Sequence, residues 1–200
     1  MKKMIIKKLK DFKNWDEIDE FSNFSYPWQK EVPPKTIFKT YHDEHYLHFK
    51  FDAYGSKPFV YVKDNNKIEV IYSERVELFF RSNEKMKPYF CLEMDPLGRI
   101  LDYKASYYRS FDRAWNWPEQ LMTKTEIEKD SYSVCGKLSL GVLKELGVLN
   151  NGNVEAGIFR GHCLGLRGKE AKINWISWIN PGTEQPDFHV PSAFGRLELQ

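Results

Sequence analysis

The chain has 200 residues, 42% of them hydrophobic and 16% aromatic, and a formal net charge of +2. This length suits a single domain with a full hydrophobic core. The near-neutral charge gives no reason to expect a nucleic-acid partner. No stretch approaches the length of a membrane span, so no membrane partner is expected either.

Lysines open the sequence, but the apolar run after them is too short for the hydrophobic region of a signal peptide. As written, the chain is expected to stay in the cytoplasm; secretion would fit a misassigned or trimmed start. The 3 cysteines are far apart and show no CxxC spacing. This pattern favours buried, reduced thiols over a zinc site or a disulfide framework.

Residues 1–35 are predicted to form a lead-in that packs on the domain, because Pro27, Pro33 and Pro34 prevent long regular structure there. From Thr36 onwards, apolar and polar residues alternate in short runs, as they do in half-buried strands. The predicted strands are 36–41, 46–52, 75–81, 89–94, 99–103, 123–129, 131–137 and 153–160, followed by a terminal pair.

A short helix is predicted at 140–146, before Gly147, and a long aromatic loop at 106–118. Short strands separated by turns are typical of two packed sheets. Residues 36–200 are therefore predicted to form one all-β domain, an antiparallel, jelly-roll-like β-sandwich with one or two short helices.

The first strand of the terminal pair carries Trp175 and Trp178. Three positions apart in a strand, the two side chains face opposite sides of the sheet. We expect Trp178 to be the exposed member and Trp175 the core member; the alternative is that Trp178 is itself a core tryptophan, since large rings are highly buried on average. An exposed indole on a rigid strand offers a large flat stacking surface at little entropic cost.

Three stretches resemble a known family when taken together. Glu74–Phe80 has the order acidic-x-Val-Glu-hydrophobic-Phe, and Tyr89–Gly98 reads Tyr-x-x-x-Glu-x-x-Pro-x-Gly. Ser177-Trp178 is then followed by Phe188-His189-Val190-Pro191 and Phe194-Gly195. From Thr36 to the end, their order and spacing resemble the carbohydrate-binding module family 9-like domains, found attached to xylanases and as stand-alone bacterial proteins. The resemblance implies an antiparallel β-sandwich, sugar binding by aromatic platforms and a place in carbohydrate catabolism.

The resemblance implies a binding mode in which two tryptophans clamp a terminal sugar between them. One of these tryptophans precedes the Val-Glu strand by a few residues. Here the aligned position is Ile71, and Tyr72 stands next to it. Either Tyr72 supplies the second wall opposite Trp178, or the clamp has one wall.

Polar groups are the second component of a sugar site, because carboxylates and guanidinium groups form paired hydrogen bonds to vicinal hydroxyls. The candidates are Glu77 on one strand, Glu93 and Tyr89 together on the next, and Arg160. The alternative for Glu77 is an ion pair with Arg81 on the same face. For the others it is a solvated sheet face or a salt bridge at the sheet end.

Trp115 and Trp117 lie in the predicted loop 106–118. Long loops without regular structure are often functional, so one of these rings could cap a site. The alternative is that they anchor the loop to the sandwich.

The predicted function is non-catalytic binding of a mono- or oligosaccharide, with the end of the sugar stacked on an aromatic ring. The first alternative is a glycoside hydrolase, for which Glu77 and Glu93 are the candidate carboxylates at about 5–9.5 Å. A haem carrier would need Met and His axial ligands, which follow no recognisable pattern. A protein-interaction module with an aromatic surface is a further alternative.

No cofactor is expected, since no Asp-rich loop indicates structural calcium and the histidines lack a compact ligand spacing. The identity of the sugar and the oligomeric state are left open by the sequence.

Overall fold

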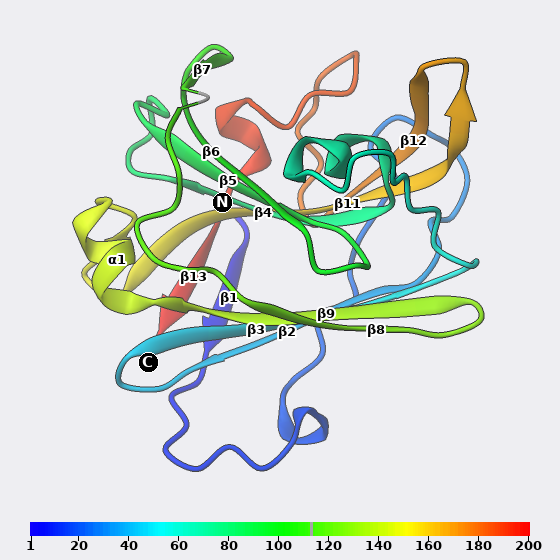
Figure 1. Ribbon diagram of the computed structural model, residues 1–200. Coiled ribbons are helices and arrows are strands. Elements are labelled where there is room, and N and C mark those ends of the chain that lie inside the picture. Colours follow the sequence, from blue (N-terminus) through cyan, green and yellow to red (C-terminus); the bar gives the residue numbers. More distant parts are fainter. Residues whose placement is uncertain (113) are drawn as a thin grey trace.

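The computed structural model describes residues 1–112 and 114–200 as two β-sheets packed face to face (Figure 1). The larger sheet has the order β1-β13-β11-β4-β5-β6-β7, and β10 and β12 also pair with β11. The smaller sheet has the order β2-β3-β9-β8. The predicted all-β sandwich is thus confirmed.

The strands of the larger sheet are β1 (Lys3–Ile6), β4 (Arg75–Arg81), β5 (Tyr89–Met94), β6 (Ile100–Ser106), β7 (Ser110–Asp112), β10 (Leu149–Asn150), β11 (Asn153–Arg167), β12 (Glu170–Ser177) and β13 (Gly195–Leu199). Those of the smaller sheet are β2 (Thr36–His42), β3 (Tyr46–Tyr54), β8 (Thr123–Ile127) and β9 (Ser131–Ser139). The helical elements are α1 (Leu140–Glu145) and the short 3₁₀ turns η1 (Trp15–Glu17), η2 (Lys67–Tyr72) and η3 (Pro191–Ala193).

The N-terminal segment contributes a strand that the sequence pattern did not predict. β1 pairs in parallel with β13, so that Met4 lies opposite Leu197 and Ile6 opposite Leu199. Met4 is 2% exposed and Ile6 is fully buried. Part of residues 1–35 is therefore built into the larger sheet, rather than only packed against the domain.

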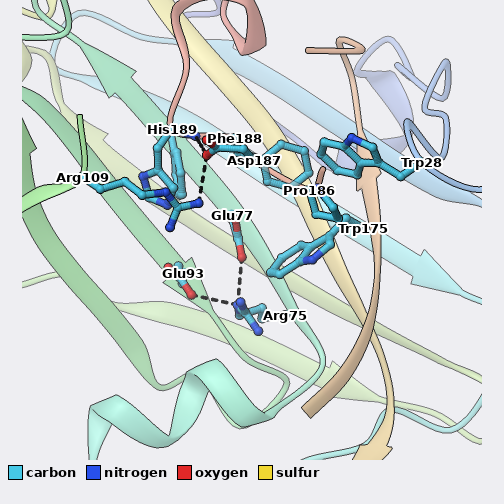
Figure 2. A pocket seen from close by; sticks show the side chains of 11 residues that line it. Trp28, Arg75, Glu77, Glu93, Arg109, Trp175, Pro186, Asp187, Phe188 and His189 are labelled. Carbon is cyan, nitrogen blue, oxygen red and sulfur yellow. Dashed lines mark hydrogen bonds and ion pairs between the residues drawn. The ribbon is translucent and has the colours of Figure 1, made fainter. Parts of the chain in front are cut away.

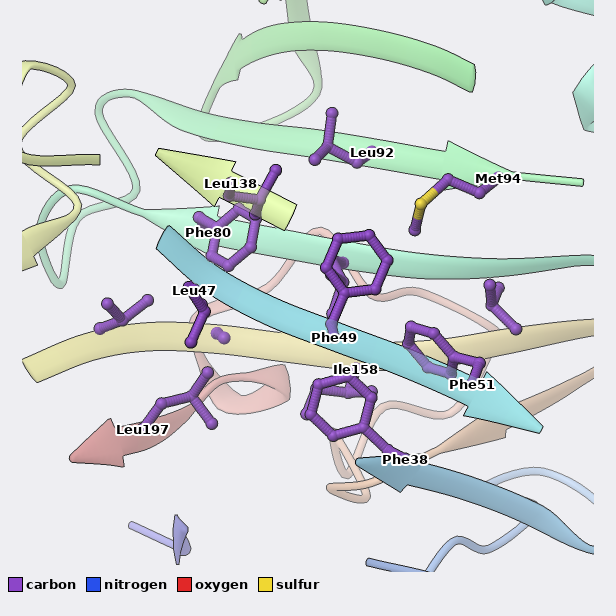
Figure 3. Close-up of a cluster of buried hydrophobic side chains, with 14 of the residues drawn as sticks. Phe38, Leu47, Phe49, Phe51, Phe80, Leu92, Met94, Leu138, Ile158 and Leu197 are labelled. Atoms are coloured by element: carbon purple, nitrogen blue, oxygen red, sulfur yellow. The ribbon is translucent and has the colours of Figure 1, made fainter. Parts of the chain in front are cut away.

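The main core lies between the two sheets (Figure 3). It follows from period-two alternation: the odd residues of β3 and the even residues of β4 and β5 point inward. Phe49 and Phe51 of β3 therefore lie in the same core cluster as Leu78 and Phe80 of β4. The odd residues of β4 and β5 lie on the opposite face of the larger sheet, outside this core.

The helix α1 begins at a capping serine, as expected for a helix start. The Ser139 hydroxyl accepts a hydrogen bond from the Val142 backbone N–H, and Gly147 follows the helix in a left-handed conformation. In the two described ranges, the helices are all too short or too polar to cross a membrane.

Candidate functional site

A pocket of about 210 Å³ opens on the face of the larger sheet that points away from the core (Figure 2). β4 and β5 form its floor, β12 forms one wall, and the segment 186–189 forms much of the rim. The lining residues are Trp28, Arg75, Glu77, Phe79, Glu93, Arg109, Trp175, Pro186, Asp187, Phe188 and His189.

The floor follows from the alternation along β4. Val76, Leu78 and Phe80 are in the main core, so Arg75, Glu77 and Phe79 point to the other side of the sheet. Glu93 on β5 lies directly opposite Glu77 in the antiparallel ladder. Two carboxylates thus stand side by side at the bottom of the pocket.

One guanidinium serves both carboxylates. Arg75 Nε donates to Glu77 Oε1 at 2.8 Å and lies 2.8 Å from Glu93 Oε2. The Tyr103 hydroxyl donates to Glu93 Oε1 at 2.9 Å. Since Nε carries a single hydrogen and gives it to Glu77, Glu93 Oε2 has no hydrogen-bond partner within residues 1–112 and 114–200.

The floor is buried: Arg75, Glu77 and Glu93 are 5%, 2% and 6% exposed. Burial, together with the neighbouring Glu93 carboxylate, raises the pKa of Glu77 to about 8, although Arg75 acts in the opposite direction. Glu77 therefore retains its proton well above the usual titration range of a glutamic acid.

Aromatic rings form the wall beside this floor. The Arg75 guanidinium lies 4.9 Å from the Trp175 ring centroid, and the Trp175 ring meets Phe188 edge-on at 5.5 Å. Phe188 in turn stacks on Phe159 of β11 at 3.9 Å and packs against Trp28 at 5.3 Å. The Trp28 indole N–H donates to the Thr183 carbonyl oxygen, which fixes its orientation.

The opposite rim is held by Asp187. Its carboxylate accepts hydrogen bonds from the Tyr108 hydroxyl at 2.6 Å and from Arg109 Nη2 at 2.9 Å. These donors come from the turn between β6 and β7, so a hairpin of the sheet is tied to the segment 186–189. Burial acts to raise the pKa of Asp187, but the hydrogen bonds and the Arg109 charge together outweigh it and hold that pKa below its ordinary value.

His189 lies behind this rim and joins it to the sheet. The Tyr89 hydroxyl is 2.8 Å from His189 Nδ1. Burial, and secondarily the Arg109 guanidinium, lowers the pKa of His189 to about 4. The imidazole is therefore neutral at pH 7, which lets Nδ1 accept the Tyr89 hydrogen.

The structure reverses the expected roles of the two C-terminal tryptophans. They do lie on opposite sides, but Trp178 is 5% exposed in the main core and Trp175 lines the pocket. The chain leaves β12 after Ser177, and the Trp178 backbone N–H donates to the Ile158 carbonyl oxygen. This anchors the Trp178 indole over the inner face, so the expectation that it is an exposed platform is wrong.

Arg160 is not in the pocket, which corrects its expected role as a ligand donor. It lies on the inner face of β11 and is 1% exposed. Its Nε donates to Glu74 Oε1 at 2.7 Å, and its Nη1 donates to Thr36 Oγ1 and the Tyr54 carbonyl oxygen of the smaller sheet. Arg160 thus connects the two sheets.

The loop tryptophans also lie away from the pocket, as anchors rather than caps. Trp117 is 6% exposed and Trp115 is half-buried, and both pack against the main core through Phe90. Part of the predicted loop is a hairpin, because β7 pairs with the end of β6. The backbone N–H of Trp117 donates to Asp102 Oδ2, which fixes the loop at the sheet edge.

The two predicted tyrosines have indirect positions. Tyr89 is fully buried beneath the rim and contacts it through His189. Tyr72 lies at the end of η2, where it packs against Tyr61, and it is not among the lining residues. Of the eight predicted site residues, Glu77 and Glu93 line the pocket.

Sequence reasoning missed most of the aromatic wall and both arginines. Phe188 belongs to the quoted Phe-His-Val-Pro stretch, and Arg75 shares the alternation of Glu77, so both had a signal. Trp28 had none, because it lies in the segment interpreted as a lead-in. Arg109 had no signal either, because it lies in the stretch 106–118 that was interpreted as a loop.

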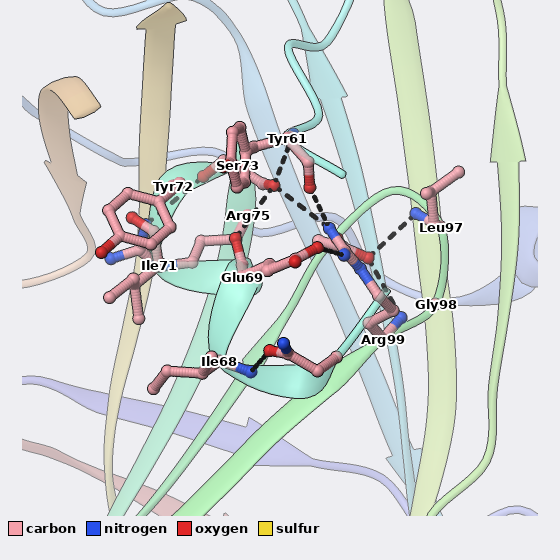
Figure 4. Close-up of polar contacts among 12 residues, drawn as sticks. Tyr61, Ile68, Glu69, Ile71, Tyr72, Ser73, Arg75, Leu97, Gly98 and Arg99 are labelled. Atoms are coloured by element: carbon pink, nitrogen blue, oxygen red, sulfur yellow. Dashed lines mark hydrogen bonds and ion pairs between the residues drawn. The ribbon is translucent and has the colours of Figure 1, made fainter. Parts of the chain in front are cut away.

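A polar network beside the pocket supports the floor from η2 (Figure 4). Arg99 Nη1 donates to Glu69 Oε2 at 2.9 Å, and Arg99 Nη2 lies 2.6 Å from Asp95 Oδ2. The Arg75 Nη1 group, in turn, donates to the Ile71 carbonyl oxygen of η2. Across the part of the chain that the structure describes, no three His, Cys, Asp or Glu side chains converge to hold a metal ion.

Comparisons with known proteins identify the fold. No known family profile matches the sequence, and a search of curated proteins finds no match. A solved structure of a Bacteroides uniformis ATCC 8492 protein, provisionally assigned as carbohydrate-binding, superposes with a TM-score of 0.77 at 16% identity, covering 100% of this chain and 99% of that one.

Two structures of a carbohydrate-binding module family 9 from Caldicellulosiruptor kristjanssonii are also similar. The complex with glucose has a TM-score of 0.58 at 14% identity, covering 100% of this chain and 96% of that one. The complex with cellotriose has a TM-score of 0.60 at 13% identity, covering 100% and 94%. Likeness at this identity establishes the fold, and the chain therefore has the β-sandwich fold of the family 9 carbohydrate-binding modules.

Proposed function

We propose that the protein binds carbohydrate without cleaving it, and that the pocket on the outer face of the larger sheet holds one sugar ring. The observation that carries this proposal is the position of the Trp175 indole beside the buried carboxylates of Glu77 and Glu93 in one pocket. A pyranose presents an apolar C–H face to an aromatic ring and hydroxyl groups at its edge. The pocket offers a partner to each.

The size of the pocket supports a single ring. Pockets for drug-sized ligands measure about 300–1,000 Å³, whereas this one measures about 210 Å³. The end of an oligosaccharide would enter, with the rest of the chain outside. The glucose and cellotriose bound by the family 9 modules of the same fold support a saccharide as the ligand class.

Tryptophan fluorescence and calorimetry with glucose, xylose, cellobiose and xylobiose test the proposal. We expect a saturable response from the wild type and its loss in Trp175→Ala. The matched control is Trp15→Ala, because Trp15 packs against Phe12 and Tyr41 on another part of the molecule. Unchanged binding by Trp175→Ala, or no binding of any sugar by the wild type, would contradict the proposal.

One observation favours hydrolysis as a second candidate: the raised pKa of Glu77 is the property that a general acid needs. The geometry favours binding instead, because Arg75 Nε lies 2.8 Å from a carboxylate oxygen of Glu77 and of Glu93, so one guanidinium already pairs with both candidate carboxylates. Release of reducing sugar from a glycan panel, lost in Glu77→Gln, would establish hydrolysis.

A further inference from the structure

The charges on the pocket do not balance. At the rim, Arg109 and Asp187 neutralise each other at 2.9 Å. On the floor, the single guanidinium of Arg75 faces the two carboxylates of Glu77 and Glu93. The floor is thus one positive charge short whenever both carboxylates are ionised.

The other neighbours of the carboxylate pair do not supply this charge. Tyr103 and Cys91 face it from β6 and β5, and burial raises the pKa of both, so that both are neutral at pH 7. His189 faces the pocket from the rim segment and is neutral as well. Among the described lining residues, Arg75 and Arg109 are the cations, and Arg109 is already paired.

The hydrogen bonds of Arg75 are consistent with this missing positive charge, because they leave one carboxylate oxygen without a donor. The Arg75 Nη1 group donates to the carbonyl oxygens of Ile71 and Ser73, and the Nε hydrogen goes to Glu77. Glu93 Oε2 is 2.8 Å from Nε but receives no hydrogen from any residue that the structure describes. Glu93 is buried, and a buried carboxylate oxygen without a donor costs free energy that a proton or a ligand cation would recover.

We propose that the pocket prefers a sugar that carries a protonated amine over the neutral sugar of the same shape, and that the amine binds at the Glu77 and Glu93 carboxylates in place of a proton held there by Glu77. This inference rests on the proposed sugar-binding function and specifies its ligand class. In the empty pocket, Glu77 holds a proton beside the Glu93 carboxylate. When the ammonium group binds, that proton leaves to solvent, and the ammonium group donates to the carboxylates in its place.

The preference has a physical source in the strength of the new hydrogen bond. An N⁺–H donor to a carboxylate forms a stronger bond than a neutral hydroxyl does. The low exposure of the floor limits screening by water and salt. Because the ligand competes with a proton, the affinity for the amino sugar should rise as the pH increases towards the pKa of the ligand amine.

Isothermal titration calorimetry with matched sugar pairs tests the inference: glucosamine with glucose, galactosamine with galactose, and mannosamine with mannose. At about pH 6, where a primary amine of this kind is protonated, the preferred amino sugar should bind about tenfold more tightly than its neutral counterpart. Titrations in two buffers with different ionisation enthalpies should show the release of about one proton per amino sugar bound. N-acetylation of the amine should abolish both effects.

Two variants separate the charge effect from folding. Glu77→Gln and Glu93→Gln each leave one carboxylate for Arg75, so either should remove the amine preference and the proton release. The control Glu126→Gln makes the same change on an exposed position of β8, in the other sheet, and should keep both.

The outcomes distinguish the inference from the proposed function. If neutral and amino sugars bind equally, or if binding releases no proton, the inference is overturned while sugar binding stands. If no sugar of any pair binds, both are overturned.

Discussion

Trp178 lies directly over Gly195: a β-carbon on Gly195 would come within 2.7 Å of the six-membered ring of Trp178. The same β-carbon would lie 2.6 Å from Ile179 Cδ1. The glycine is thus required by space, because an indole occupies the position where any other side chain would begin. The absence of a side chain at Gly195 leaves room for the Trp178 indole in the core, whereas Trp175 of the preceding strand lines the pocket.

Replacing Gly195 with alanine should destabilise the fold by about 1–3 kcal/mol, because the added methyl group overpacks the core. Gly195 begins β13, and β13 pairs with both β1 and β11, so the strain would be transmitted to two neighbouring strands. Urea unfolding followed by tryptophan fluorescence measures the loss. The control Gly141→Ala, on an exposed position of α1, places its β-carbon no closer than 3.3 Å to another side chain, the Ser139 hydroxyl, and should change the midpoint much less. Equal midpoints for Gly195→Ala and the wild type would contradict the overpacking.

The two tryptophans show what the sequence could and could not predict. Period-two alternation places Trp175 and Trp178 on opposite sides, but it is symmetric and does not say which side is the core. That choice depends on Gly195 and Phe188, which reach the two rings from other segments of the chain. Strand positions, set by local alternation, were predictable; which rings are exposed depends on tertiary contacts.

For charged residues, too, local alternation predicts the face of the strand but not the tertiary partner. The alternation along β4 placed Glu77 on the face opposite Val76 and Leu78, and the structure agrees. Arg160 shares the inner face of β11 with Ile158, and an arginine is tolerated there only because Glu74 pairs with it. That pairing joins positions 86 apart in the sequence, and no local pattern records it.

Acid should weaken the fold through His189. Its pKa is about 4 in the folded state and about 6.5 in an unfolded chain. Between these values the unfolded chain binds a proton that the native state does not, so stability falls as the pH decreases from about 6.5 to about 4. The loss should be on the order of 3 kcal/mol, since one pKa unit corresponds to about 1.4 kcal/mol.

Unfolding free energies at intervals between pH 7 and about pH 4 measure this dependence. His189→Asn keeps an acceptor for the Tyr89 hydroxyl and removes the titrating ring, so its stability should fall less steeply with acid. His45→Asn, on the exposed turn between β2 and β3, should follow the wild type. Parallel curves for wild type and His189→Asn would mean that His189 titrates normally.

The Arg99 network should govern the stability of the region around η2. Arg99 bridges the carboxylates of Glu69 and Asp95, and its Nη2 group also donates to the Tyr61 carbonyl oxygen. In Arg99→Met, two acidic groups would face each other without a cation, so the urea midpoint should fall. The control Lys104→Met removes a more exposed ion pair with Asp112 on the neighbouring strand. A midpoint equal to that of the control would show that the network contributes little.

The same variant should loosen the pocket floor indirectly, because Arg75 is held by the Ile71 carbonyl oxygen at the end of η2. Sugar affinity in Arg99→Met should therefore decrease although Arg99 does not line the pocket. Calorimetry on the folded variant checks this. Unchanged affinity with reduced stability would confine the role of Arg99 to folding.

Arg160 and Glu74 form a buried ion pair, and breaking it should lower the free energy of unfolding more than any of the other substitutions. Both side chains are 2% exposed, and the pair also holds Thr36 Oγ1 and the Cys163 backbone N–H. Arg160→Met leaves the Glu74 carboxylate buried without its cation, and such a loss costs about 3–5 kcal/mol. Arg167→Met, on an exposed position of the same strand, should change the free energy of unfolding by less than about 0.5 kcal/mol.

The double variant Arg160→Met with Glu74→Gln identifies why Arg160→Met loses stability. The glutamine keeps an acceptor for the Cys163 N–H and removes the uncompensated charge, so the double variant should be more stable than Arg160→Met alone. If the two substitutions were additive, the destabilisation would come from lost packing of the arginine side chain. Recovery in the double variant would instead show that Arg160 serves to neutralise Glu74 between the sheets, which leaves ligand contacts to the pocket on the opposite face.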